Sequence, residues 1–265
     1  MKLDYYEVLV PNETPYKSYQ EHINRYAFAS DFVKDKVVLD IACGTGYGSD
    51  YLRKKEGRMI VGGDLSKNYL DYATSHYRHG KELVFVCLDA LNLPFHDGSF
   101  DVLISLETIE HLKYPSRFLS ECKRVLRMGG KFICSTPNKQ IFSPYRKVSV
   151  PVHVHEFYID EFCDLLKEYF VEVKLYAQRY VNLPHRVARS LIHVGSELVN
   201  TVPGGHGIKN VARKLLPYLF HADTIARLGV EIRDEILDRR HAVIPYWKSF
   251  WSVPGCITAV ARKRI

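Results

Sequence analysis

The amino-acid sequence predicts an α/β fold in which helices cover both faces of a mainly parallel sheet. Short β-rich apolar runs alternate with helical patterns along most of the chain, as in folds whose strands are connected through helices. The 265 residues suit one large domain, or one domain with an elaboration. A composition of 46% hydrophobic and 25% charged residues is ordinary for a globular protein and excludes a collagen-like or wholly disordered chain.

Seven apolar runs are predicted to form the strands. They are short and rich in valine, isoleucine, leucine and phenylalanine, and the first of them, VVLDIAC, leads into a glycine-rich turn. The runs cover residues 37–43, 59–65, 83–88, 100–106, 131–137, 170–177 and 256–261.

Helical patterns fill most of the gaps between these strands. They cover residues 69–76, 116–126 and 160–169, and an amphipathic helix is predicted over 16–33, ahead of the first strand. The pair Gly129-Gly130 predicts the end of a helix before the fifth strand, because glycine commonly terminates helices.

Residues 179–250 interrupt the alternation, and we expect them to form a helical cap on the substrate side of the sheet. Leu191, Val194 and Leu198 have helical spacing, and further helical patterns follow within the same segment. The predicted division is therefore a core of residues 1–178 and 251–265 with the cap inserted at 179–250.

The positive charge of the chain is concentrated in its last third. Residues 1–178 contain 23 basic and 24 acidic residues, a net charge of −1, whereas residues 179–265 contain 14 basic and 6 acidic residues, a net charge of +8. A basic surface there would suit an anionic partner, such as a nucleic acid, a membrane surface or a phosphorylated substrate. The alternative is an ordinary solvated surface.

Other features predict a cytoplasmic protein with reduced cysteines. The first residues, MKLDYYEVLVPNE, include acids and lack the apolar stretch of a signal peptide. No run of about 18 apolar residues predicts a membrane-spanning helix. The six cysteines are scattered and form no C-x-x-C pair, which favours buried thiols.

The strongest functional signal is the segment DIACGTGYG at residues 40–48, directly after the first predicted strand. Its glycines remove side chains where a ligand must approach the backbone. Asp64 ends the second strand, where an acid can bond ribose hydroxyls, and Asp89 ends the third, where a carboxylate can accept from an adenine amine. Capping of loops and helices is the alternative role for Asp40 and Asp64. The glycines do not follow G-x-G-x-x-G, so a dinucleotide site is not favoured.

The chain resembles class I S-adenosylmethionine-dependent methyltransferases in the order and spacing of five motifs. These are VLDIACGTG, GGDLS, LDALNLPFHDGSFD, ISLETIEHL and RVLRMGGKFICSTPN. The resemblance covers residues 16–178 and the last strand. It implies a Rossmann-like, seven-stranded sheet with a reversed last hairpin, and methyl transfer with S-adenosylmethionine as cofactor.

The resemblance also implies a position for each part of the cofactor. Asp64 would bind the ribose, and Asp89 with Ala90 the adenine. Arg25 matches an arginine of ubiquinone-type methyltransferases and would pair with the cofactor carboxylate, the alternative being a cation on the helix surface. Ala42 stands where the family has its first motif glycine. The implied cofactor-binding set is Arg25, Asp40, Ala42, Cys43, Gly44, Gly46, Asp64, Leu65, Asp89, Ala90, Leu91 and Leu106.

Acidic and histidine residues are predicted to form the chemical end of the site. Glu107, Glu110 and His111 follow the fourth strand, where functional groups lie in open α/β folds, and His153 follows the fifth strand and its loop. The pattern E-x-x-E-H plus H-x-H-x-F resembles small-RNA 2′-O-methyltransferases, in which such residues bind magnesium beside the target hydroxyl. These four residues are therefore candidates for catalysis and for binding Mg²⁺ or another divalent metal.

Metal-free alternatives stay open for the same residues. Glu110 would cap the following helix, and His111 would be a structural histidine. In a second alternative, His111 or His153 acts as a general base without a metal. His155 shares a face with His153 if this segment is extended and points away if it is not.

A further resemblance concerns the methyl acceptor. The segments 22–29 and 153–178 resemble a bacterial and archaeal subgroup often associated with surface-polysaccharide and glycan assembly. This implies a hydroxyl of a saccharide or a similar small metabolite as acceptor, with the basic cap facing a nucleotide sugar, a lipid-linked glycan or a membrane surface. The second hypothesis is RNA 2′-O-methylation, and the third is a cofactor-binding protein without transferase activity.

Overall fold

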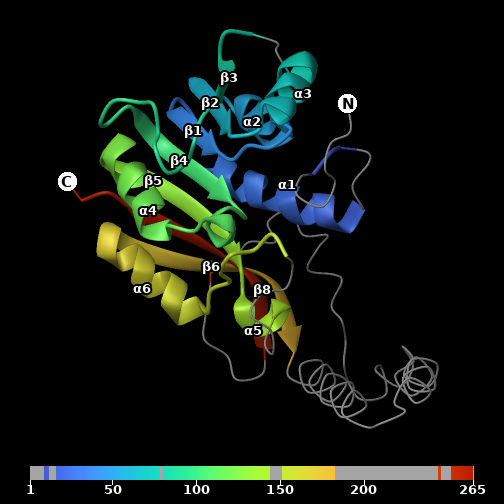
Figure 1. The fold of residues 1–265 in the computed structure, drawn as a ribbon, viewed down its shortest axis with the longest axis vertical. Coiled ribbons are helices and arrows are strands. Elements are labelled where there is room, and N and C mark those ends of the chain that lie inside the picture. The colour runs from blue at the N-terminus through green and yellow to red at the C-terminus, as the bar shows by residue number, and fades with distance from the viewer. Residues whose placement is uncertain are drawn as a thin grey trace.

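The structure, a computed structural model, describes residues 9–11, 16–77, 80–143, 151–182, 244–245 and 252–264. Its centre is one twisted sheet, which Figure 1 shows with helices on either side. The strands are β1 (Val37–Ile41), β2 (Met59–Asp64), β3 (Leu83–Cys87), β4 (Phe100–Leu106), β5 (Leu126–Pro137), β6 (Val171–Asn182), β7 (Ile244–Pro245) and β8 (Ser252–Arg262). In space their order is β3-β2-β1-β4-β5-β8-β6-β7.

The predicted fold class is confirmed. Strands β1 to β5 pair in parallel, whereas β8 runs antiparallel between β5 and β6. This is a Rossmann-like, seven-stranded sheet with a reversed last strand pair, and the two-residue strand β7 adds to its edge. Parallel strands need long crossover connections, which are usually helices, and this explains the alternation seen in the sequence.

Helices cover both faces of this sheet, as Figure 1 shows. The described helices are α1 (Tyr16–Ser30), α2 (Tyr47–Arg53), α3 (Lys67–Tyr77), η1 (Ile109–His111), α4 (Pro115–Val125), α5 (Lys139–Phe142) and α6 (Ile159–Tyr169). Helices α4 and α6 pack their apolar sides against one face of the sheet, and α1 and α2 pack against the other. The hydrophobic core thus consists of two layers, one on each side of the sheet.

Several predicted boundaries differ from the structure: α1 ends at Ser30 rather than at 33, β5 begins at Leu126 rather than at 131, and β8 covers Ser252–Arg262 rather than 256–261. Gly129-Gly130 does not end a helix, because α4 already ends at Val125 and the glycine pair lies inside β5. The pairing of β5 with β4 shifts register next to these glycines, and Gly129 has a left-handed φ of 73°, which glycine adopts at little cost.

The predicted cap at 179–250 contains strand residues near both of its ends. Strand β6 continues to Asn182, four residues beyond the predicted boundary at 178, and β7 lies near the other end of the segment. The rest of the predicted cap, including its helical patterns, lies outside the described residues.

Burial of the cysteines follows the expectation for four of the six. Cys43, Cys122, Cys134 and Cys256 are buried, and Cys163 is partly exposed. Cys87 is exposed because β3 forms the edge of the sheet. Within the described part of the chain, no helix combines the length and the apolar character needed to cross a membrane.

Candidate active site

A cavity of about 850 Å³ lies at the carboxyl ends of the parallel strands. Open α/β sheets bind ligands at this edge, because the loops that follow neighbouring strands meet there. Twelve of the predicted site residues line the cavity: Ala42, Cys43, Gly44, Asp64, Leu65, Asp89, Ala90, Leu106, Glu107, Glu110, His111 and His153.

The turn after β1 has the backbone conformation that its glycines predict. Gly44 and Gly46 have left-handed φ angles of 54° and 81°. A Cβ atom on Gly46 would lie 2.6 Å from the Cβ of Ala73 and 2.8 Å from the ring of Phe85, so this position has no room for a side chain. Ala42 is also left-handed, with φ 59°, a conformation that costs an alanine on the order of 1 kcal/mol.

Asp64 connects the end of β2 to this turn. Its Oδ2 accepts a hydrogen bond from the Gly44 N–H at 2.8 Å, and its Oδ1 accepts one from the Ser66 N–H at 2.8 Å. Burial raises the pKa of Asp64, and the backbone N–H groups that it binds lower it. Asp64 therefore makes the capping contacts of the alternative hypothesis, and it also lines the cavity.

Arg25 lies behind the cavity lining and is not the surface cation of the alternative hypothesis. Its side chain is 3% exposed, and its Nη1 donates to Oε1 of Gln178 at 2.6 Å. Its Nη2 lies 3.9 Å from Oε2 of Glu107. Burial alone would lower the pKa of Arg25, but Glu107 and other neighbours raise it and keep the guanidinium charged.

Asp40 is buried behind the turn and does not line the cavity; Gly46 and the partly exposed Leu91 do not line it either. Asp40 accepts hydrogen bonds from Ser49 Oγ at 2.6 Å and from the Tyr26 hydroxyl at 3.2 Å. Burial raises the pKa of Asp40 to about 7, while these two hydrogen bonds lower it. Asp40 thus supports the turn from inside the protein.

The buried position of Asp40 predicts a measurable pH dependence of stability. The folded chain holds a proton on Asp40 up to about pH 7, whereas an unfolded aspartate ionises near pH 4. The stability that Asp40 contributes is therefore lost as the pH rises from about 4 through about 7. In urea unfolding, Asp40→Asn should gain stability relative to wild type over this interval, by on the order of 4 kcal/mol.

The matched control is Asp31→Asn, because Asp31 is exposed. Its unfolding free energy should follow the wild type at each pH. If the free energy of unfolding changes with pH equally in the wild type and in Asp40→Asn, the raised pKa of Asp40 is contradicted.

At the chemical end of the cavity, Glu110 is fully buried. Its Oε2 accepts a hydrogen bond from Thr136 Oγ1 at 3.0 Å, and no described residue donates to its Oε1. Burial, and then the charge of Glu107, raise the pKa of Glu110. Glu110 does not cap the next helix, because α4 begins at Pro115 without a side-chain cap.

His111 and His153 lie next to each other, with ring centroids 4.8 Å apart and the rings nearly perpendicular. The loop that carries His153 is fixed by the Glu110 carbonyl, which accepts from the N–H groups of Val154 and His155 at 2.8 and 3.0 Å. His155 points away from the cavity: its side chain is 48% exposed and binds Glu161.

Each cavity histidine is oriented through its Nδ1 atom. His111 Nδ1 lies 3.2 Å from the Val152 carbonyl, and His153 Nδ1 lies 2.5 Å from Oε1 of Glu156. Glu156 is fully buried, and its other oxygen accepts from the Ser143 hydroxyl. A carboxylate or carbonyl on one ring nitrogen orients the ring, both in general bases and in metal-binding histidines.

The predicted group of four metal ligands is reduced to three. Ligand atoms of Glu110, His111 and His153 all lie within 4.8 Å of one another. Glu107 does not belong to this group; its Oε1 accepts from Ser135 Oγ at 2.8 Å and from Cys256 Sγ at 3.3 Å. One carboxylate and two imidazoles suit zinc or another transition metal better than magnesium, which prefers oxygen ligands.

Sequence reasoning missed several residues of the site. His22 and Tyr26 line the cavity from α1, and their spacing of four residues on one helix face is the signal that could have placed them. Glu156 follows directly on the H-x-H pattern, and its role becomes visible only once the loop is folded. Burial lowers the pKa of His22, and the positive charge of Arg25 lowers it further.

Comparisons with known proteins support the methyltransferase resemblance. Residues 39–134 match the methyltransferase domain family. A probable S-adenosylmethionine-dependent methyltransferase of Mycolicibacterium smegmatis is 36% identical over 143 residues, covering 52% of this chain and 52% of its own. The ubiquinone biosynthesis O-methyltransferase of Coxiella burnetii is 32% identical over 108 residues, covering 40% and 46%. The chain therefore spans about half the length of the curated relatives it matches.

Solved structures show the same fold at low sequence identity. Phosphoethanolamine N-methyltransferase 2 of Haemonchus contortus, in complex with phosphomonomethylethanolamine and S-adenosylhomocysteine, is 18% identical, with a TM-score of 0.55 over 92% of this chain and 53% of its own. The [4+2]-cyclase SpnF is 18% identical, with a TM-score of 0.56 over 97% and 86%. One fold thus carries different reactions, and function must be argued from the site. This chain is therefore similar to S-adenosylmethionine-dependent methyltransferases in one matched domain, in about half of its sequence and in its fold.

Proposed function

We propose that this chain transfers a methyl group from S-adenosylmethionine to a hydroxyl of a saccharide or a similar small metabolite. The observation that carries the proposal is a single cavity with two chemically distinct ends. One end has the glycine turn and Asp64, and the other has His111 and His153. The Coxiella burnetii relative is named as an O-methyltransferase, which supports oxygen as the acceptor atom.

The residues of the first end fit the cofactor. Asp64 and Asp89 follow adjacent strands and offer carboxylates for ribose hydroxyls and for the adenine amine. The left-handed turn at Gly44 brings backbone to the cavity wall. Arg25 supplies a buried positive charge behind the lining, which favours the cofactor carboxylate nearby. When bound, the cofactor supplies an electrophilic methyl group on a sulfonium.

The residues of the second end would handle the acceptor proton. A hydroxyl becomes a better nucleophile as its proton is removed, and a positioned histidine is the usual general base. His153 is the best candidate, because the buried Glu156 carboxylate binds its Nδ1 and orients the ring. The proton would then be taken up at Nε2 of His153. The remaining contribution is positioning of the acceptor.

A divalent metal is an alternative way for the same residues to act. Glu110, His111 and His153 would hold it, as a carboxylate and two imidazoles with an open position. There it would polarise the acceptor hydroxyl.

The deciding experiment is methyl transfer from labelled S-adenosylmethionine into a host-cell extract, followed by separation into nucleic-acid, glycan-lipid and small-molecule fractions. We expect label in sugars, lipid-linked glycans or small hydroxylated metabolites. Label in RNA would instead support the second hypothesis, which the net charge of +8 over residues 179–265 favours. Cofactor binding without label in any fraction would support the third, a cofactor-binding protein.

A further inference from the structure

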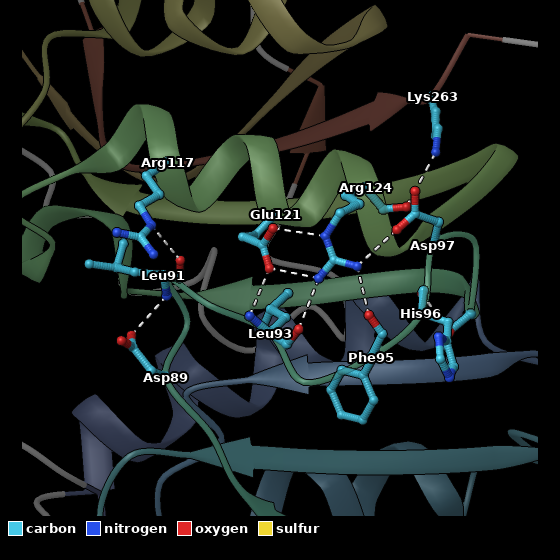
Figure 2. Close-up of polar contacts among 11 residues, drawn as sticks. Asp89, Leu91, Leu93, Phe95, His96, Asp97, Arg117, Glu121, Arg124 and Lys263 are labelled. Atoms are coloured by element: carbon cyan, nitrogen blue, oxygen red, sulfur yellow. Dashed lines mark hydrogen bonds and ion pairs between the residues drawn. The ribbon is translucent and has the colours of Figure 1, made fainter.

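Three side chains on one face of α4 contact the loop between β3 and β4, residues 88–99. Arg117, Glu121 and Arg124 are separated by four and three residues, so they project from the same side of the helix. Figure 2 shows all three directed at this loop. The loop begins at the adenine end of the cavity, which Asp89 and Ala90 line.

Arg124 uses all five of its N–H groups, two to bind Glu121 on the same helix and three to bind the loop. Its Nε and Nη2 bind the two carboxylate oxygens of Glu121 at 2.8 and 2.7 Å. The other three N–H groups bind the carbonyls of Leu93 and Phe95 and the carboxylate of Asp97, at 2.9, 2.7 and 2.9 Å. Lysine has only three donors and no planar fork, so it cannot reproduce this set.

Arg117 holds the start of the same loop, next to the cavity. Its Nε donates to the carbonyl of Leu91 at 2.8 Å, and the N–H of Leu91 donates to Oδ1 of Asp89 at 2.8 Å. Figure 2 shows this chain of contacts from Arg117 to Asp89. The peptide groups of Leu91 are therefore held on both sides, and the orientation of the Asp89 carboxylate depends on them.

We infer that Arg117 and Arg124 are positioning residues for adenine recognition. They hold the loop so that Asp89, with Oδ1 bound by Leu91, presents Oδ2 to the exocyclic amine of adenine. Neither arginine lines the cavity, so each acts through the loop. The inference rests on the proposed function, because it takes S-adenosylmethionine as the ligand and Asp89 as the adenine partner.

Arg117 provides the sharper test, because it is exposed and its loss should leave the fold intact. Arg117→Met removes the donor. Arg117→Gln keeps an amide nitrogen as many bonds from Cα as Nε. The probes are S-adenosylhomocysteine and S-inosylhomocysteine, in which a carbonyl oxygen replaces the adenine amine, and calorimetry gives both dissociation constants.

Wild-type protein should prefer the adenosyl compound. In Arg117→Met, affinity for that compound should fall by about threefold to tenfold, the effect of one hydrogen bond, while affinity for the inosyl compound changes little. The preference between the two compounds should therefore narrow, and Arg117→Gln should restore it. A merely structural role would lower both affinities equally and leave the preference unchanged.

Arg124→Lys extends the test to the second arginine. We expect amide hydrogen exchange at residues 91–97 to accelerate and the preference for the adenosyl compound to narrow, although the positive charge is kept. Unchanged exchange and unchanged preference would overturn the role of Arg124.

The matched control is Arg262→Met. Arg262 forms a surface ion pair with Glu172 at 3.4 Å, and neither residue lines the cavity. The affinities of Arg262→Met for the adenosyl and inosyl compounds should equal those of the wild type. If wild type binds the adenosyl compound and Arg117→Met keeps the full preference, the inference is overturned while the proposed function stands. If wild type binds neither compound, the proposed function fails and the inference with it.

Discussion

Replacing His153 by alanine should lower kcat for methyl transfer by about 100-fold or more, the usual effect of removing a general base. His153 lines the cavity, and the buried Glu156 orients its ring. The neighbouring His111 has its Nδ1 3.2 Å from a backbone carbonyl, that of Val152. The rate should be measured with the extract fraction that accepts the label, at saturating S-adenosylmethionine.

The chain offers a closely matched control two residues away. His155 has the same side chain, but it is 48% exposed and binds Glu161 outside the cavity. His155→Ala should keep the wild-type rate, and both variants should bind S-adenosylhomocysteine as the wild type does. Full activity in His153→Ala would remove His153 from the mechanism.

His153→Ala would disable both a histidine base and a metal site, so this variant cannot distinguish the two roles. Removal of metal with a chelator can distinguish them. If His153 is the base, protein treated with EDTA should transfer methyl groups at its full rate. A loss of rate that added zinc or manganese restores would instead place a metal on Glu110, His111 and His153. Elemental analysis of the purified protein gives a readout independent of activity.

Replacing Asp64 by alanine should weaken binding of S-adenosylhomocysteine by about 10-fold to 100-fold, or roughly 1.4–2.8 kcal/mol. The variant would lose the carboxylate that we propose to bind the ribose. It would also lose the hydrogen bonds to the N–H groups of Gly44 and Ser66, which connect the turn to β2. Calorimetry measures the affinity, and urea unfolding shows whether the fold is retained.

Asp164→Ala is the control for this variant, because Asp164 lies on the exposed side of α6 and pairs with Lys167. Its affinity should match the wild type. A wild-type affinity in Asp64→Ala would contradict the ribose assignment of Asp64.

Much of the fold and of the cofactor end could be predicted from the sequence, because local patterns encode them. The central strands β1, β2 and β4 are almost wholly buried, so each is a short apolar run, and β4 occupies the predicted residues 100–106. The carboxyl ends of parallel strands meet at one edge, so residues that end successive strands, such as Asp64 and Asp89, were predicted to share a site.

Long-range contacts decided the rest. Arg25 binds Gln178, 153 positions away, because the reversed β8 brings β6 beside the parallel strands and thus under α1. No local pattern encodes that pairing, and the sequence left Arg25 between a surface cation and a cofactor ligand. Only the folded loop after β5 separates His153 from His155, because a side chain's direction in an irregular segment depends on its tertiary contacts.

The sequence by itself determined the sheet, the glycine turn and the carboxylates at the strand ends, since periodicity and glycine placement are local properties. Only the tertiary structure decided which acidic and histidine side chains lie together. It places Glu110, His111 and His153 in one group. Glu107 lies outside this group and accepts hydrogen bonds from Ser135 and Cys256. The physical reason is that burial and hydrogen-bond partners come from strands distant in the chain, and these set the position of each functional group.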